Sequence, residues 1–313
     1  MKRTSAPQRI VITGASRGIG RATALALAER GAHLVLCARG IDALEEVAAA
    51  ARSCGAASAH AIVLDVADDA SVRAGCRQVL ELGPVDALIN NAGGCEQKTF
   101  LAQAPEQCEY ETVVNFLGPQ RMVRALLPSM LERRTGTILN VSSLLGAVPC
   151  PTTATYSGAK AALNAWSHAL RGELTDSGVR VVVFMPSHTD TEGGARSRFD
   201  GVYLLPLDYT VRELLRALDR APRSYTTSPV FRMFLRVAAV FPVWGERQVA
   251  RSTRAVLASS PKPHAPPRTA HLPTPSPDRT PWSRGAPRRT EPSPPPSTCS
   301  DSPSEQTRAK HPS

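Results

Sequence analysis

Two residues of the chain pair a weak acid with a cation at a spacing that suits proton transfer. Tyr156 and Lys160 are four residues apart, so a helix would place both on one face. A tyrosine has a pKa of about 10 and is a poor acid or base at neutral pH, but a neighbouring ammonium group favours the phenolate. Such a phenol could pass a proton to a carbonyl oxygen as hydride arrives, or remove one in reverse, an effect worth on the order of 10²–10⁴ in rate. This spacing is common on ordinary helices; it gains weight from Ser143, thirteen residues upstream at an expected strand end, and from a glycine-rich turn.

The glycine-rich turn could hold a phosphate group. The run Thr13-Gly14-Ala15-Ser16-Arg17-Gly18-Ile19-Gly20 follows an apolar strand pattern and precedes a helix pattern. Glycines there permit a tight turn, close backbone approach to a pyrophosphate and close packing of helix on strand. The helix N-terminus then offers free N–H groups to the phosphates. A lone glycine cluster is weak evidence, but the strand-turn-helix context is the one that phosphate binding requires.

The end of the second expected strand bears on the choice of nicotinamide cofactor. A site that prefers NAD places a carboxylate there, about 20 residues past the glycines, for the ribose 2′-hydroxyl. This strand instead ends Cys37-Ala38-Arg39-Gly40. Arg39 could bind a 2′-phosphate, and Arg17 lies in the loop close to the same place. Both could be ordinary surface arginines, but with the acid missing we favour NADP(H).

Apolar runs and amphipathic stretches alternate from residue 9 to about residue 185, which predicts an α/β fold. The expected strands are Arg9–Thr13, Leu34–Cys37, Ala61–Leu64, Ala87–Asn90, Thr137–Val141 and Val179–Phe184. The expected helices are near 18–30, 41–54, 69–82, 105–132 and 156–177. Apolar strands separated by helices indicate a parallel sheet covered on both faces. We therefore expect a Rossmann-type doubly wound sheet in a three-layer α/β/α sandwich, with ligands beyond the carboxyl ends of the strands.

At this point the chain resembles the short-chain dehydrogenase/reductase family over roughly residues 9–192. The cofactor loop TGxxxGxG is followed in order by Asp65, by the Asn90-Asn91-Ala92-Gly93 motif, and by Asn115, Ser143, Tyr156 and Lys160. The resemblance implies an NADP(H)-dependent oxidoreductase acting on a carbonyl or an alcohol, usually as a homodimer or homotetramer. It implies catalytic roles for Ser143, Tyr156, Lys160 and Asn115. It implies cofactor contacts for Gly14, Ser16, Arg17, Gly18, Ile19, Gly20, Arg39, Asp65, Asn91, Ala92, Gly93, Tyr156, Lys160, Pro186, Thr189 and Thr191.

Family spacing also interprets single positions around the expected site. It selects Ser143, rather than Ser142, as the hydroxyl that holds the substrate oxygen. Thr191 matches a threonine that touches the carboxamide. Ser187 replaces the usual glycine, which puts the local turn in doubt. His188 is expected to line the nicotinamide pocket rather than to act as a second acid.

Asn115 lies four residues before Pro119 in the long expected helix. Proline has no N–H, so the Asn115 carbonyl loses its helical partner. That free acceptor could hold a water, which in the family links the lysine to solvent. The proline could equally produce only a kink, and both interpretations stay open.

The C-terminal part is less informative. Residues 193–228 hold the region in which the family builds its substrate lid, followed by a helix near 209–221. The segment 229–244 is unusually apolar, with Arg232 and Arg236 four apart. Packing over the active site or in a dimer is favoured over a membrane interface. Residues 259–313 hold 15 of the 27 prolines and almost no large aliphatic residues, so we expect a disordered tail after a single domain, 1–258.

Composition narrows the function classes. The net charge of +10 comes from scattered basic residues without interleaved aromatics, which disfavours nucleic-acid binding. Seven cysteines without a CxxC pair or a metal-ligand cluster indicate reduced thiols in the cytoplasm and no metal site. No signal peptide or spanning segment is expected. Two alternatives remain: a catalytically silent dinucleotide-binding regulator, and a sugar epimerase or dehydratase on the same fold.

Overall fold

A parallel β-sheet forms the centre of the computed structural model, which describes residues 8–191, 204–254 and 258. The strands are β1 (Arg9–Thr13), β2 (His33–Ala38), β3 (Ser58–Val63), β4 (Ala87–Asn90), β5 (Gly136–Val141), β6 (Val179–Met185) and β7 (Ser224–Thr226). They pair in the order β3-β2-β1-β4-β5-β6-β7, and every pair is parallel. The order reverses between β1 and β4, where such sheets bind ligands. The predicted doubly wound sheet is confirmed.

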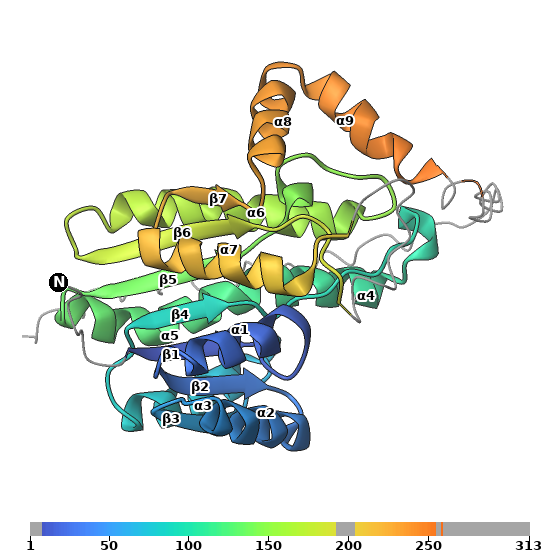
Figure 1. Ribbon diagram of the computed structural model, residues 1–313. Helices are drawn as coiled ribbons and strands as arrows, with labels where there is room; N and C mark the ends of the chain where they lie inside the picture. Colours follow the sequence, from blue (N-terminus) through green and yellow to red (C-terminus); the bar gives the residue numbers. More distant parts are fainter. Residues whose placement is uncertain (1–7, 192–203, 255–257, 259–313) are drawn as a thin grey trace, which may run out of the picture. The chain divides into compact units, whose positions relative to one another are not determined.

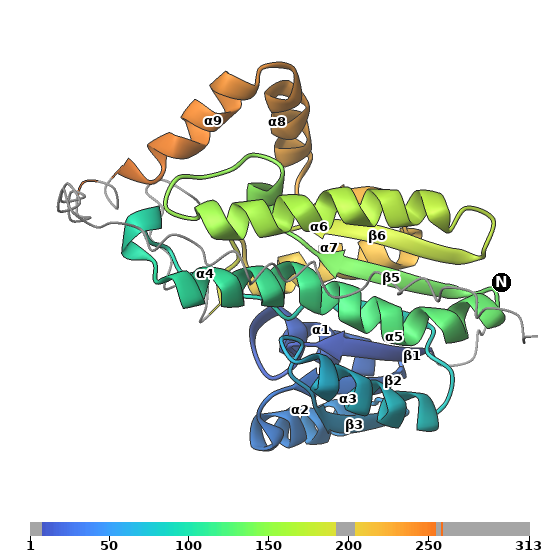
Figure 2. The same ribbon diagram turned by 180° about the vertical axis from the view of Figure 1, so that it is seen from behind.

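Helices cover both faces of the sheet, which confirms the three-layer sandwich. Figure 1 shows α1 (Gly18–Ala28), α2 (Ile41–Ser53) and α7 (Leu207–Arg220) on one face. Figure 2 shows α3 (Asp69–Glu81), α5 (Gly118–Glu132) and α6 (Ala154–Glu173) on the other. Along β1, Ile10 and Ile12 join one buried cluster and Val11 joins the other. Because both faces are buried, the central strands read as largely apolar runs rather than as an alternation of apolar and polar residues.

The single helix expected over 105–132 is interrupted in the structure. The chain forms α4 (Pro105–Thr112), a π-helical turn η2 (Val113–Leu117) and then α5. Within this turn the Gly118 N–H donates to the Val113 carbonyl, one residue further back than in an α-helix. Pro119 has no N–H to offer to the Asn115 carbonyl, and the wider turn accommodates this loss.

The third strand was misplaced by the sequence prediction. It begins at Ser58 rather than Ala61 and ends at Val63, so Asp65 lies in the following loop and not at the strand end. β3 is an edge strand, and Ser58 and His60 interrupt any apolar run. Half-exposed edge strands give a weaker sequence signal than buried ones.

In the region 193–228, where a substrate lid was expected, the helix expected near 209–221 is confirmed as α7. α7 packs on the sheet with Leu214 fully buried, and β7 adds a seventh strand beside β6. The apolar segment that follows is two helices, α8 (Pro229–Val240) and α9 (Pro242–Arg251). Residues 193–203 of the expected lid, and the expected disordered tail 259–313, lie outside the described residues. Among the helices that are described, none is long and apolar enough to cross a bilayer.

Candidate active site

A cleft of about 840 Å³ opens at the carboxyl ends of the strands. Of the predicted site residues, those that line it are Gly14, Ser16, Arg17, Gly18, Ile19, Arg39, Asp65, Asn91, Ala92, Gly93, Asn115, Ser143, Tyr156, Lys160, Pro186, Thr189 and Thr191. Gly20 does not line the cleft. It packs so tightly against the Gly14 carbonyl that a Cβ would clash there. Gly20 therefore permits the approach of α1 to the loop rather than contact with a ligand.

The glycine loop is shaped by β4 as much as by its own residues. Gly14 has φ of +64°, and a Cβ there would lie 2.8 Å from the Ala92 Cα. The Thr13 hydroxyl accepts the N–H groups of Asn91 and Ala92, both at 3.0 Å. The Asn91 amide donates to the Thr13 and Gly14 carbonyls at 3.0 and 3.1 Å. These bonds hold the glycine loop against the segment that follows β4.

The N-terminus of α1 is open toward the cleft. Arg17 occupies its cap position without a side-chain cap hydrogen bond, and the first turn contains no acidic residue. Its unsatisfied N–H groups and the positive end of the helix dipole favour an anion. Thr191 lies on the opposite side, 3.7 Å from the position that a Gly18 Cβ would take. The loop after β6 thus approaches the phosphate-binding turn.

Arg39 extends from the end of β2 to the rim of the cleft. Its guanidinium donates to the Tyr110 hydroxyl at 2.6 Å. Tyr110 lies on α4 and lines the same cleft, although the sequence analysis did not single it out. The bond holds the arginine head near the loop that carries Arg17.

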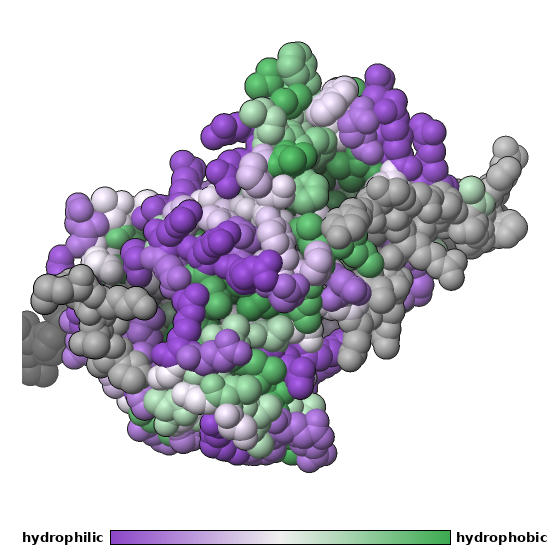
Figure 3. All heavy atoms as spheres, in the orientation of Figure 1, coloured by the Kyte–Doolittle hydropathy of each residue, from purple (hydrophilic) through white to green (hydrophobic). Residues whose placement is uncertain are grey.

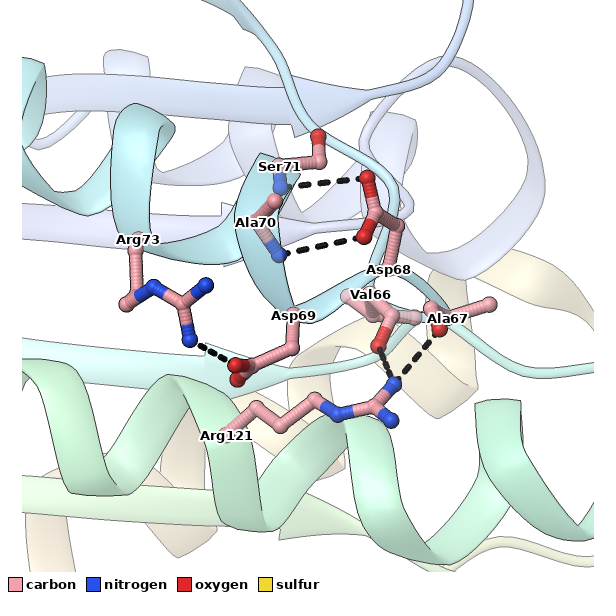
Figure 4. A network of polar contacts seen from close by, with 8 residues as sticks. All are labelled: Val66, Ala67, Asp68, Asp69, Ala70, Ser71, Arg73 and Arg121. Carbon is pink, nitrogen blue, oxygen red and sulfur yellow. Dashed lines mark hydrogen bonds and ion pairs between the residues drawn. The ribbon is translucent and has the colours of Figure 1, made fainter.

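The loop that carries Asp65 is held by two helices, as Figure 4 shows for its outer part. Arg121 of α5 donates to the Val66 and Ala67 carbonyls at 3.1 and 2.6 Å. Asp68 caps α3 by accepting two backbone N–H groups. The Asp65 carboxylate accepts the Ala67 N–H at 2.9 Å, which keeps its side chain beside the cleft.

The catalytic candidates come from β5 and α6. Ser143 follows β5; its hydroxyl accepts the Leu145 N–H at 3.1 Å, and it lies near enough to Tyr156 to lower the pKa of the phenol. Lys160 is 3% exposed and donates to the Val141 carbonyl at 2.8 Å, with its Nζ 5.7 Å from the centroid of the Tyr156 ring. Ser142 instead donates to the Lys160 carbonyl at 3.4 Å. The two serines thus have different partners, and Ser143 is the one beside the tyrosine.

Burial sets the proton affinities of this group. It raises the pKa of Tyr156 well above its ordinary value, with a further increase from Cys95, while the bond to Ser143 lowers it. Burial lowers the pKa of Lys160 to about 8. Burial thus opposes the phenolate that the lysine is expected to favour, and the effect of the lysine stays a prediction. Tyr156 is a neutral phenol at pH 7, which is the state of a proton donor.

The buried lysine should make stability depend on pH. Its pKa is about 8 in the folded protein against an ordinary 10.5, so between these values the unfolded chain holds a proton that the folded chain has lost. Stability then rises with pH across this window, by up to roughly 3 kcal/mol. Urea unfolding should therefore show the wild type gaining stability relative to Lys160→Met between these pH values. A constant difference would contradict the lowered pKa.

His188 also lines the cleft. Burial lowers its pKa to about 4, so the imidazole is neutral at pH 7 and is a weak proton donor. The neighbouring Ser187 is buried and does not have a positive φ. A serine can therefore replace glycine at this turn without backbone strain.

Asn115 is fully buried in the π-helical turn. Its amide donates to the Gly94 and Glu111 carbonyls at 2.7 and 2.9 Å, and its oxygen accepts the Gly94 N–H at 3.3 Å. A Cβ at Gly93 would lie 2.7 Å from the Asn115 oxygen and 3.4 Å from the Lys160 Nζ. Asn115 thus holds the loop after β4 against the lysine; a water on its backbone carbonyl stays a prediction.

Glu111 is a buried acid in the cleft wall that the sequence analysis missed. It is 3% exposed, accepts the Glu96 N–H, and has a raised pKa because of burial. It lies four residues before Asn115, so helical spacing from the asparagine could have indicated it.

The comparisons with known proteins agree with this geometry. Residues 8–200 match the short chain dehydrogenase family. The mouse (Mus musculus) dehydrogenase/reductase SDR family member 7B is 34% identical over 186 residues, which is 58% of this chain and 58% of the relative. This chain thus matches little more than half the length of that relative.

Two solved structures extend the likeness. A short-chain dehydrogenase from Sphingobium yanoikuyae in complex with NADPH has a TM-score of 0.68 and 28% identity, covering 84% of this chain and all of the other. An alcohol dehydrogenase from Thermococcus sibiricus complexed with 5-hydroxy-NADP has a TM-score of 0.64 and 31% identity, covering 71% of this chain and 96% of the other.

Proposed function

Because the chain belongs to the short-chain dehydrogenase family of oxidoreductases, we propose that it is an NADP(H)-dependent enzyme that interconverts a carbonyl group and an alcohol. The observation that carries the proposal is the placement of Ser143, Tyr156 and the buried Lys160 together in one cleft, with the Lys160 Nζ 5.7 Å from the centroid of the Tyr156 ring. This group lies in the same cleft as the glycine loop. A protein that only sensed a dinucleotide would need the loop but not these three side chains.

The residues present fit NADP(H). The uncapped N-terminus of α1 and the crowded Gly14 leave backbone N–H groups and no side chain where a pyrophosphate would bind. Arg39 and Arg17 supply positive charge where a 2′-phosphate would bind, and no carboxylate ends β2. The two solved structures described above were determined with NADPH and with 5-hydroxy-NADP, which supports the same cofactor here.

The side chains divide the chemistry as follows. Bound NADPH supplies the hydride. Ser143 donates a hydrogen bond to the substrate oxygen and positions it beside Tyr156. Tyr156, a neutral phenol at pH 7, donates its proton to that oxygen. Lys160, beside the tyrosine ring, would stabilise the phenolate that remains and could hydrogen-bond the ribose of a bound cofactor.

A turnover assay tests the proposal. The protein is mixed with NADPH and with each of a panel of ketones and aldehydes, and loss of the reduced nicotinamide absorbance is followed. At least one carbonyl compound should be reduced to its alcohol, with the product identified by mass spectrometry. NADPH binding without turnover on any compound would favour the silent regulator instead.

Replacing Arg39 with aspartate should change the cofactor preference. The wild type should prefer NADPH over NADH in kcat/KM, because a charged hydrogen bond to the 2′-phosphate is worth about 1.5–3 kcal/mol. Arg39→Asp removes that bond and repels the phosphate, so this preference should fall by about tenfold to a hundredfold. Steady-state kinetics with both cofactors measures the ratio.

Arg77→Asp is the matched control, since Arg77 is an exposed arginine of α3 that does not line the cleft. It should leave the ratio unchanged. A wild type that already prefers NADH would show that the cofactor assignment is wrong.

A further inference from the structure

The helices α8 and α9 form a hairpin, residues 229–251, after the last strand (Figures 1 and 2). The two helices pack on each other: the rings of Phe234 and Trp244 lie 5.8 Å apart, and a Cβ at Gly245 would clash with Ala238. The base of the hairpin also touches the rest of the fold, where the Cys150 thiol lies 4.0 Å from the Val249 carbonyl. The hairpin is therefore an ordered part of the protein.

The outer side of the hairpin is apolar although it faces solvent. The exposed large apolar residues are Val230 (73%), Met233 (58%), Val240 (69%), Phe241 (61%), Val243 (58%) and Trp244 (43%). On α8, Val230, Met233 and Val240 share one helical stripe, while Ala238 faces α9 on a different side. Figure 3 shows hydrophobic surface over α8 and the turn at the end of the hairpin. Contiguous apolar surface of this kind marks an interaction site.

The hairpin also carries a net positive charge. Four exposed arginines, Arg232, Arg236, Arg247 and Arg251, stand against the single acid Glu246, a net charge of +3 over residues 229–251. Arg232 and Arg236 are one turn apart on α8, beside the apolar stripe. Long arginine side chains beside an apolar surface can keep their charge at a polar boundary while their stems cover apolar groups.

We propose that this hairpin is a peripheral membrane-binding surface that inserts its apolar turn between the lipids of an anionic bilayer. Val240, Phe241 and Val243 would enter the acyl boundary, and Trp244 would lie at the headgroup level, where its amphipathic ring is favoured. Arg232 and Arg236 would meet the lipid phosphates. The inference concerns a surface outside the cleft and does not depend on the proposed reaction.

The sequence alone favoured packing of the hairpin in a lid or a dimer over a membrane interface. The structure favours the membrane interface instead. No described hairpin residue lines the cleft, so the segment does not serve there as a lid. A second copy seated on the same face would bring two arginine-rich surfaces together, and like charges oppose such a contact. An anionic partner complements both the charge and the apolar turn.

Vesicle flotation of the full-length protein tests the proposal. The vesicles contain phosphatidylcholine alone or phosphatidylcholine mixed with phosphatidylserine. The wild type should float with the mixed vesicles at low salt and much less with the neutral ones. Binding should weaken as salt rises toward 1 M, because the Debye length then falls to about 3 Å.

Two variants locate the contact. Arg232→Glu with Arg236→Glu should reduce the partition coefficient by about tenfold or more, while turnover stays unchanged. Phe241→Asp should reduce it comparably, since a charge replaces the inserted ring. Arg73→Glu with Arg77→Glu on α3 makes the same change in net charge elsewhere and should keep binding within about twofold. Trp244 fluorescence should shift to the blue on vesicle addition, and Trp244→Phe should lose that shift.

Three results would overturn the proposal. One is a wild type that stays unbound at low salt. A second is equal loss of binding in the α3 control, which would mean that net charge alone attracts the protein. The third is full binding by both hairpin variants, which would place the contact on another part of the chain. Release of a dimer to monomers by Phe241→Asp, without any vesicle binding, would assign the surface to a second copy.

Discussion

Tyr156→Phe should retain the fold and NADPH binding but lower kcat by roughly 10²-fold or more. The substitution removes the hydroxyl that would donate the proton in the proposed mechanism and leaves the ring next to Lys160 in place. The loss should fall on kcat rather than on the KM for NADPH, because the phenol acts on the reacting oxygen. Steady-state kinetics on any carbonyl substrate that the panel identifies measures both constants.

Tyr209→Phe is the matched control. Tyr209 lies on α7 outside the cleft and donates to the Thr227 carbonyl at 2.7 Å. Its loss should cost about 1 kcal/mol of stability and leave kcat unchanged. Near-normal turnover in Tyr156→Phe would contradict the proposed mechanism, whatever the control shows.

The central strands were predictable because a strand that is buried on both faces appears in the sequence as a run of apolar residues with the same limits. β1 and β4 begin and end where the sequence analysis placed them. β3 and β7 lack that property. β3 is an edge strand with polar residues at its start, and β7 has three residues, which is too short for a periodic pattern. The seventh strand was therefore missed and the third displaced.

The phosphate loop and the catalytic group were predictable from local spacing, because each is formed by residues close in sequence at a strand end. Tyr110 and Glu111 enter the cleft through the packing of α4, which the sequence does not specify. The sequence likewise does not specify how strongly Tyr156 holds its proton. The sequence shows the neighbouring lysine, but the burial that opposes its effect exists only in the folded chain.

The region after β6 was only partly predicted from the sequence. Residues 207–226 were assigned to the lid region, yet α7 packs against α1 and covers the sheet. Its apolar stripe has the period of an amphipathic helix that completes a sandwich layer. The helix near 209–221 was therefore predicted from its spacing, whereas its place on the sheet was not.

Ser143→Ala should lower kcat by roughly 10²–10³-fold, and Ser142→Ala should lower it far less. The first range is the usual cost of removing one preorganised donor to a reacting oxygen. The two serines are adjacent and chemically identical. A difference in kcat between the two alanine variants therefore reports the position of the hydroxyl and not its chemistry. Ser143 lines the cleft beside Tyr156, whereas Ser142 is 2% exposed and donates to the Lys160 carbonyl within the protein.

The ordering of the two serine variants is the decisive measurement. Loss of the Ser142 bond should lower the melting temperature, because it joins β5 to α6, while most of kcat remains. Loss of the Ser143 hydroxyl also removes its bond from the Leu145 N–H, so both variants should lose some stability, but only Ser143→Ala should lose most of its turnover. Ser143→Thr keeps a hydroxyl and should recover part of the lost kcat. The reverse ordering, with Ser142→Ala the less active variant, would mean that the substrate oxygen is held by the other serine and that the cleft geometry has been assigned to the wrong residue.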